Sequence, residues 1–189
     1  MPYAPPPELA ALSLGELAEQ VAARKLPPVD QWSPQEVGDS EMCIAADGRW
    51  FHQGGEIRRP AMVRAFSSLL TRDEAGQHWL VTPFQKLSIA VEDAAFIATD
   101  MQVKLDAEGR SALAFRLNSD DLVVCGADHP LRVAGTAEVP AFYLAVRYGT
   151  EARLNRSTYG QLIDYALSLG GAELAVESLG QRFVLVPEA

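Results

Sequence analysis

Two stretches of the chain carry the same order of apolar and polar segments. Residues 50–83 read as an apolar strand, a turn, an amphipathic helix over 60–70 and a second apolar strand, and residues 142–187 repeat that order. Counted from Arg59 and from Arg156, four apolar positions recur in register: Met62, Phe66, Leu69 and Leu70 correspond to Tyr159, Ile163, Ala166 and Leu167. The repetition predicts duplicated strand-turn-strand-helix-strand units in which Phe66 and Ile163 both belong to the core.

Between these stretches the pattern changes to a period of two. From residue 88 to residue 126, apolar and polar residues alternate in runs that turn residues separate, as is typical of antiparallel strands with one solvated face. A helix over 157–169 needs an apolar sheet face to cover, and Val103, Phe115 and Val124 are candidates for it. The C-terminal half is therefore predicted to be a curved sheet capped by a helix.

A proline-rich segment and a short helix precede both halves. Ser13 with Glu16 three residues later forms a capping-box pattern, and Pro27-Pro28 ends the helix that follows it. The fold class predicted for the whole chain is α+β with mainly antiparallel sheets. Its parts are an N-terminal helix and extended segment (1–33), an α/β subdomain (34–87) and a β-rich subdomain with its capping helix (88–189).

The amino-acid composition and the net charge indicate which classes of binding partner to expect. The 189 residues are 48% hydrophobic and 22% charged, as in ordinary globular proteins, and the net charge is −9. Such a field opposes binding to a phosphate backbone, so nucleic acid is not expected as a partner. The chain starts without a secretory signal pattern and has no apolar run that could span a membrane, so we expect a cytoplasmic protein without a membrane partner.

The familiar signatures of chemistry are missing from the sequence. It contains no nucleophile elbow, no phosphate-binding glycine loop, and no zinc or calcium motif, so no catalytic residue, metal or cofactor is predicted. Two polar motifs remain as candidates. Glu92 and Asp93 are adjacent acids, and His129 follows Asp128, which could orient it as a general base. Each motif has an alternative interpretation as turn residues that bond to the local backbone.

The positions of the arginines indicate a candidate anion-binding site more specifically than these two motifs do. Arg59 and Arg156 each stand directly before a predicted helix, and Arg147 lies at the end of a predicted strand. In a closed duplicated fold, such guanidinium groups could point into one cleft and bind a carboxylate or phosphate through paired hydrogen bonds. The alternative is that each arginine pairs with a local acid, such as Glu56 or Glu151.

Several short segments together resemble a known family. They are residues 47–50, 57–60, 66–68, 80–83, 91–93, 129–131 and 146–147, with Lys86 and Asn118. In combination, these segments resemble the bacterial family catalogued as domain of unknown function 1285, over about 26–183. The resemblance implies domain duplication, a C-terminal half superficially similar to pleckstrin homology folds, and a ligand site where the domains meet. It implies small-molecule sensing or signal transduction and no particular reaction.

These observations lead to three hypotheses about function. The first is a binding or signalling module whose cleft between the halves takes a small anionic metabolite. We expect Lys86, Asp93, Asn118, His129 and Arg147 to converge there, because each lies at a predicted strand end or turn, where side chains are free to leave the sheet. Its candidate ligand-binding residues are Arg59, Lys86, Asp93, Asn118, His129, Arg147 and Arg156.

The second hypothesis is a hydrolase or lyase that uses Asp93 or Glu92 with His129. The third is a protein-interaction domain, with a protein partner or a second copy bound at an exposed sheet edge. An arginine- and lysine-rich cleft would favour binding, a carboxylate–imidazole hydrogen bond would favour catalysis, and a large exposed apolar patch would favour interaction.

Overall fold

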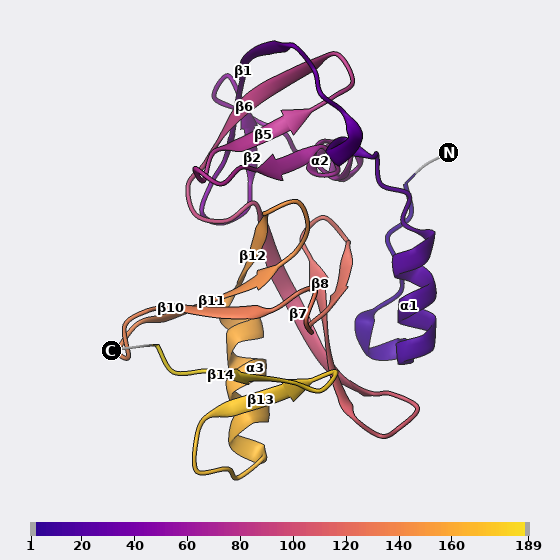
Figure 1. Ribbon diagram of the computed structural model, residues 1–189, viewed down its shortest axis with the longest axis vertical. Helices are drawn as coiled ribbons and strands as arrows, with labels where there is room; N and C mark the ends of the chain where they lie inside the picture. Colours follow the sequence, from indigo (N-terminus) through magenta and orange to yellow (C-terminus); the bar gives the residue numbers. More distant parts are fainter. Residues whose placement is uncertain (1–2, 188–189) are drawn as a thin grey trace.

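The computed structural model describes residues 3–187 and shows an α+β protein (Figure 1). Two six-stranded mixed sheets, a two-stranded hairpin and three α-helices make up its regular structure over these residues. The α+β class predicted from the sequence is confirmed.

The first sheet and its helix form the upper part of Figure 1. Its strand order is β3-β2-β1-β6-β5-β4, and β1 and β6 run parallel at its centre while the other neighbours run antiparallel. Helix α2 (Pro60–Ser67) connects β3 to β4. The strands are β1 (Glu36–Ile44), β2 (Trp50–His52), β3 (Gly55–Glu56), β4 (Leu70–Arg72), β5 (His78–Val81) and β6 (Gln85–Val91).

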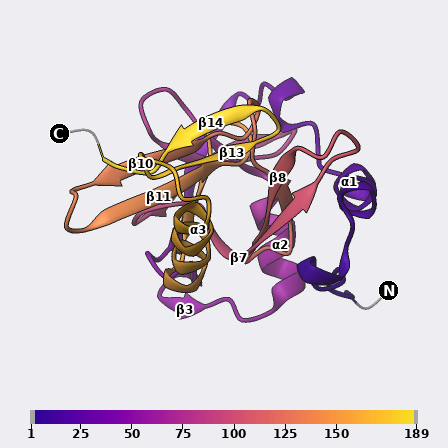
Figure 2. The ribbon, with the colours of Figure 1, turned by 90° about the horizontal axis from the view of Figure 1, so that it is seen from below.

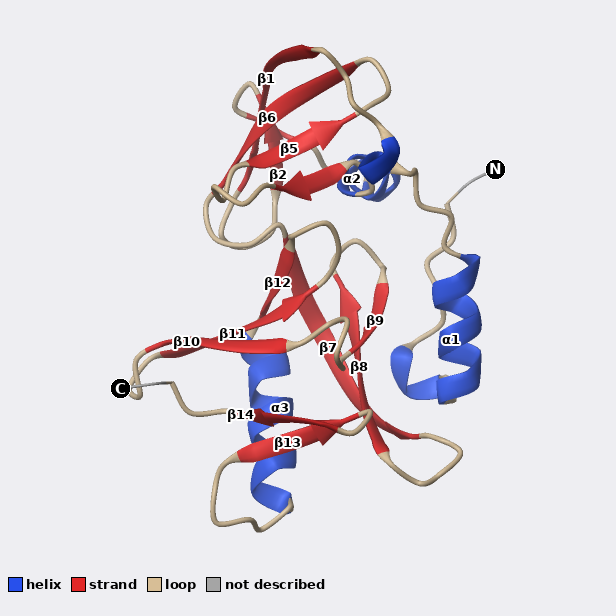
Figure 3. Cartoon of the chain, viewed as in Figure 1, coloured by secondary structure: helices blue, strands red, loops and turns tan. Residues whose placement is uncertain are grey.

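The second sheet has the order β10-β11-β12-β7-β8-β9, with β12 and β7 parallel at its centre (Figure 3). Helix α3 (Arg156–Ser168) follows β12 and leads to a hairpin of β13 (Ala175–Ser178) and β14 (Gln181–Val184). The sheet strands are β7 (Phe96–Leu105), β8 (Ser111–Leu117), β9 (Leu122–Val124), β10 (Leu131–Gly135), β11 (Pro140–Ala145) and β12 (Glu151–Leu154).

Both sheets are built on one plan, which differs from the repeat that the sequence predicted. Each consists of two three-stranded antiparallel meanders, joined by a parallel pairing of the first strand with the last. The equivalent spans are 36–91 and 96–154, rather than 50–83 and 142–187. The two helices also occupy different places, because α2 lies between the meanders of its sheet whereas α3 follows the last strand. The match of apolar positions is therefore only partial: Phe66 and Ile163 both pack on the core, but Leu70 belongs to β4 and Leu167 is exposed.

The chain changes sheets between Val91 and Phe96, later than the change at residue 88 that the sequence suggested. Strand β6 pairs with β1 and β5 of the first sheet up to Val91. The change of pattern near residue 88 therefore falls inside β6 and does not mark the sheet boundary.

Helix α2 is shorter than the helix predicted to reach Leu70. The hydroxyls of Ser67 and Ser68 donate to the carbonyls of Arg64 and Ala65, at 2.9 and 2.6 Å, and satisfy the helix end. Leu70 instead begins β4 and is fully buried. Phe66 stacks on Trp50 with ring centroids 6.3 Å apart, so it packs on the core as predicted.

The second sheet is covered on both faces (Figure 2). Helix α3 packs on β7 and β12 as predicted, and its residue Ile163 is half-buried against the core. The opposite face is covered by the N-terminal segment, where Leu9 and Leu17 pack against Ala114 and Val124. Val124 thus contacts the N-terminal segment and not α3, because neighbouring strand residues point to opposite faces.

Helix α1 (Leu14–Ala23) begins at the predicted capping box. The Ser13 hydroxyl accepts from the Glu16 backbone N–H at 3.2 Å, and the Glu16 carboxylate accepts from the Ser13 N–H at 2.8 Å. Leu17 is its one buried residue, so the helix lies on the protein surface with most of its length in solvent.

The two domains meet in a closely fitted junction. The Arg72 N–H donates to the Tyr148 carbonyl at 2.9 Å, and Asn118 accepts from the Ile97 N–H at 3.0 Å while its amide donates to the Gly48 carbonyl at 3.4 Å. One hydrophobic core continues through both sheets. A cavity lined by residues of both domains lies at this junction.

Candidate functional site

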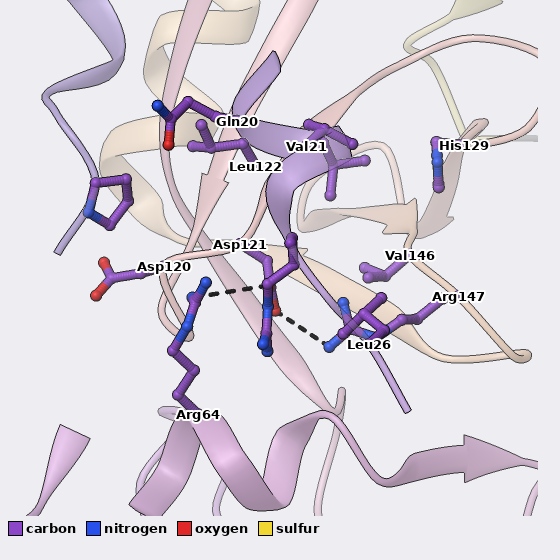
Figure 4. Close-up of a pocket in the computed structure, with 13 residues that line it drawn as sticks. Gln20, Val21, Leu26, Arg64, Asp120, Asp121, Leu122, His129, Val146 and Arg147 are labelled. Atoms are coloured by element: carbon purple, nitrogen blue, oxygen red, sulfur yellow. Dashed lines mark hydrogen bonds and ion pairs between the residues drawn. The ribbon is translucent and has the colours of Figure 1, made fainter. Parts of the chain in front are cut away.

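A cavity of about 180 Å³ opens where the N-terminal segment meets both domains (Figure 4). We refer to it as the junction cavity. Arg24 follows α1, Arg64 projects from α2, and Arg147 follows β11, so three distant parts of the chain each bring one guanidinium group to its wall. Asp121, between β8 and β9, lies among them.

Asp121 is the centre of this group of charges. Its side chain is 4% exposed and accepts hydrogen bonds from Arg24 Nε at 2.7 Å, from the Ser119 hydroxyl at 2.7 Å and from Arg147 Nη2 at 3.1 Å. Arg64 Nη1 lies 3.7 Å from the same carboxylate. We call Asp121 and its three arginines the arginine cluster.

The turn before β9 positions this carboxylate. Asp120 adopts a left-handed backbone conformation with a φ of 62°, and its N–H donates to the Leu117 carbonyl at 2.9 Å. Both acids of this turn line the junction cavity. Asp120 is held by Arg116 at 2.6 Å and by the Tyr3 hydroxyl, whereas Asp121 pairs with the arginines of the cluster. Asp120 is therefore neutralised locally and does not balance the arginine cluster.

Asp121 and Arg147 both remain ionised in the arginine cluster, although both are buried. Burial raises the pKa of Asp121, but the charge of Arg147 and the hydrogen bonds from Arg24 and Ser119 outweigh it, so the pKa lies below its usual value. Burial lowers the pKa of Arg147 by more than Asp121 restores. The guanidinium group still remains charged at any physiological pH.

Positive charge and hydrogen-bond donors both exceed what Asp121 can balance. Three guanidinium groups face one carboxylate, although the whole chain carries a charge of −9. Arg24 Nη2 and Arg147 Nε are buried and have no hydrogen-bond partner. Buried donors without partners are costly, and charged ones more so. The junction cavity therefore has the excess of positive charge to hold an anion.

Two of the residues predicted from the sequence line the junction cavity, namely His129 and Arg147. His129 Nδ1 lies 3.1 Å from the Ala145 carbonyl, which is the local backbone contact that the alternative interpretation described. Arg147 also donates to the Ser67 carbonyl at 3.3 Å and lies 5.0 Å from the centre of the Phe96 ring, so it joins the two domains as well.

The other predicted residues lie elsewhere, so the structure does not bring the five expected residues to one place. Lys86 Nζ lies 4.2 Å from the centre of the Trp79 ring in a separate hollow. Asn118 braces the junction through backbone groups. Arg59 and Arg156 are exposed at the starts of α2 and α3. Binding at any of these positions stays a prediction.

Asp93 belongs to a second, smaller hollow of about 90 Å³ on another side of the junction. It accepts from the Tyr143 hydroxyl at 2.6 Å and from Arg153 at 2.9 Å, while Glu151 accepts from Arg132 through two contacts of 2.8 Å. Acids and arginines are paired here, and burial together with Asp93 raises the pKa of Tyr143. Tyr143 therefore stays protonated, which does not suit a base or nucleophile.

The carboxylate–imidazole pair of the enzyme hypothesis does not form. The Glu92 carboxylate accepts from the Ala46 N–H at 2.8 Å, Asp93 is engaged by Tyr143 and Arg153, and His129 bonds to the backbone. Throughout residues 3–187, no group of three or more His, Cys, Asp or Glu side chains could hold a metal ion, and no helix is long and apolar enough to span a membrane.

The sequence did not single out Arg24, Arg64 or Asp121. Arg24 reads as a helix-end cation, Arg64 as a solvated position of α2, and Asp121 as a turn residue. The feature of the sequence that could have indicated the site is the pair of adjacent acids, Asp120 and Asp121. Two neighbouring residues in a tight turn point in different directions, so one of them can face the interior.

His78 gives a prediction on pH. Its side chain is 8% exposed in β5, and its pKa is lowered by burial and by Arg72, against the opposing effects of Asp73 and Glu151. The unfolded chain therefore binds a proton on this ring more readily than the folded chain does. We expect stability to fall as the pH drops below about 6.5, by at most about 1.4 kcal/mol per pH unit from this group.

Denaturant titrations between pH 7.5 and 5 would measure this slope in the wild type and in His78→Gln. The slope should decrease in His78→Gln and persist in the matched variant His52→Gln, because His52 is exposed. An unchanged slope in His78→Gln would show that other groups produce it.

Fold and site together define a two-domain α+β protein with a charged cavity where the domains meet. Residues 27–94 match the domain described as "Domain of unknown function (DUF1285), N-terminal domain", and residues 95–185 match "Protein of unknown function (DUF1285), C-terminal domain". The chain belongs to the DUF1285 family. The division between 94 and 95 falls in the connection between the two sheets.

Solved structures agree with this assignment. A DUF1285 family protein from Silicibacter pomeroyi DSS-3 is 38% identical with a TM-score of 0.73, over 90% of this chain and 94% of that chain. A DUF1285 family protein from Shewanella baltica OS155 shares the fold at 23% identity with a TM-score of 0.52, over 65% of this chain and 90% of that chain. No curated protein matches the chain.

Proposed function

We propose that the protein is a binding module for a small anion, which the arginine cluster holds in the junction cavity. The observation that carries the proposal is the excess of three guanidinium groups over Asp121, the carboxylate that contacts them. Carboxylates and phosphates bind guanidinium groups through paired hydrogen bonds. An anion would balance this excess of positive charge.

The position of the junction cavity supports a signalling role. Arg64 belongs to the first domain, Arg147 to the second, and Arg24 to the N-terminal segment. An anion bound to all three would favour the arrangement in which these parts are together, since a ligand shifts a conformational equilibrium by its differential affinity. The shared plan of the two sheets supports domain duplication as the origin of this junction.

Arg64→Gln tests the proposal. Arg64 is partly exposed and lies 3.7 Å from Asp121, and it also donates to the Ser119 carbonyl at 2.5 Å and lies over the Tyr3 ring. The melting temperature of Arg64→Gln without phosphate is therefore measured first, as the baseline for its response to phosphate. We expect inorganic phosphate to raise the melting temperature of the wild type, relative to chloride at equal ionic strength. In Arg64→Gln the affinity for phosphate should fall about ten-fold or more, because one charged hydrogen bond is lost.

The matched control is Arg58→Gln, at an exposed arginine of the same domain whose partner is Glu56 at 3.0 Å. It should bind phosphate like the wild type. If Arg64→Gln and Arg58→Gln bind equally, the anion does not occupy the junction cavity. If titration calorimetry detects no binding of phosphate or of any carboxylate to the wild type, the proposed function is wrong.

A further inference from the structure

Apolar side chains make up much of the wall of the junction cavity. Val123 and Val146 are almost fully buried, at 5% and 4% exposed, whereas Val21 of α1 is 43% exposed. In Figure 4, Val21 and Leu122 lie above the groups of Arg64 and Asp121 that meet lower in the view. The apolar wall consists of Pro6, Val21, Leu26, Leu122, Val123 and Val146.

This wall is more than a bare anion requires. A phosphate or sulfate ion is hydrated on all sides and gains nothing from valine and leucine side chains. A ligand with an apolar group would remove these side chains and its own surface from water together. The composition of the wall therefore discriminates between a simple ion and an ion that carries an apolar group.

The size of the junction cavity limits that apolar group. Cavities of about 150 Å³ in protein cores accommodate one benzene molecule. At about 180 Å³, the junction cavity has space for one ring or a short branched chain together with a charged head.

We propose that the ligand is an amphiphilic anion of the size of benzoate: a carboxylate or phosphate head attached to one compact apolar group. The proposal rests on the anion-binding function above and specifies its ligand class. The head pairs with the guanidinium groups of Arg24, Arg64 and Arg147, and the apolar group lies against Val123 and Val146. Val21 covers the ligand from the side of α1.

Titration calorimetry of the full-length protein with four probes at equal ionic strength tests the ligand class. Sodium benzoate is the amphiphile, sodium acetate carries the head alone, benzamide is the neutral counterpart, and sodium phosphate is the hydrophilic anion. We expect benzoate to bind about ten-fold or more tightly than acetate, because burial of a ring exceeds that factor. Benzamide should bind at least ten-fold more weakly than benzoate, because it leaves the guanidinium groups without an anion.

Two variants in α1 test whether the ligand binds beside Val21. Val21→Glu puts a carboxylate beside the apolar group and should weaken benzoate binding about ten-fold, while Ala18→Glu, at an exposed position of the same helix outside the cavity wall, should not. Equal affinities for benzoate, acetate and phosphate would overturn the amphiphile and leave the anion site standing. Equal affinities for benzoate and benzamide would overturn it as well. No binding by any anionic probe would overturn the proposed function itself.

Discussion

Replacement of Asp121 by alanine is expected to lower the free energy of unfolding by about 3 to 5 kcal/mol. The carboxylate is 4% exposed and, among residues 3–187, is the one acid that contacts all three arginines of the arginine cluster. Without it, Arg24, Arg64 and Arg147 would be left partly buried and mutually repelling. Urea denaturation of the wild type and the variant at pH 7 would measure the difference.

The matched control is Asp47→Ala, at an acid that is 53% exposed and paired with Arg49. It should cost less than about 1 kcal/mol, as exposed ion pairs usually do. Phosphate should stabilise Asp121→Ala more than it stabilises the wild type, because an anion can replace the missing charge. Equal losses in the two variants would show that the charges of the arginine cluster are not coupled.

The pH dependence of the same variant follows from the lowered pKa of Asp121. Because the folded chain holds this carboxylate ionised to a lower pH than the unfolded chain does, its contribution is fully present above about pH 4. The stability difference between the wild type and Asp121→Ala should therefore be constant near neutral pH. It should decrease only as the pH falls through the lowered pKa.

Replacement of Phe96 by alanine is expected to cost about 3 to 5 kcal/mol. Phe96 begins β7, is 1% exposed, and packs in the core that both sheets share. Its ring also lies under Arg147, so its removal takes away a cation–π contact and leaves a cavity beside the arginine cluster. Chemical denaturation followed by tryptophan fluorescence would measure the loss.

Phe84→Ala is the same substitution at a phenylalanine that is 81% exposed, and it should change stability by no more than about 0.5 kcal/mol. Phe96→Leu should fall between the two, because leucine fills most of the space without the aromatic face. A small effect of Phe96→Ala would contradict the close fit of the junction.

Features held by contacts between residues close in the chain were predicted from the sequence, whereas features held by contacts between distant residues were not. The capping box at Ser13 and Glu16 was predicted because both bonds of that motif lie within one helical turn. The two central parallel pairings were not predicted, since β1 with β6 and β7 with β12 join residues far apart in the chain. The end of α2 was missed because the bonds from Ser67 and Ser68 compete with helix continuation and leave no periodic trace.

Only some of the site residues predicted from the sequence line the junction cavity. His129 and Arg147 were chosen because they lie at strand ends, and both line the junction cavity. Lys86 and Asp93 were chosen for the same reason and lie in other hollows. Position at a strand end makes a side chain available for a site, but it does not determine which side of a sheet or which domain that side chain faces.

The sequence by itself determined the α+β class, the places of most helices and strands, and the family, because periodicity, capping and short motifs are local properties of the chain. Only the tertiary structure decided the course of the sheets, the place of the N-terminal helix and the arginine cluster. Arg24, Arg64 and Asp121 come from three separate segments, and each has an ordinary local explanation. Their combined charge has chemical meaning only because folding places both arginines within 4 Å of the Asp121 carboxylate, which is itself shielded from water.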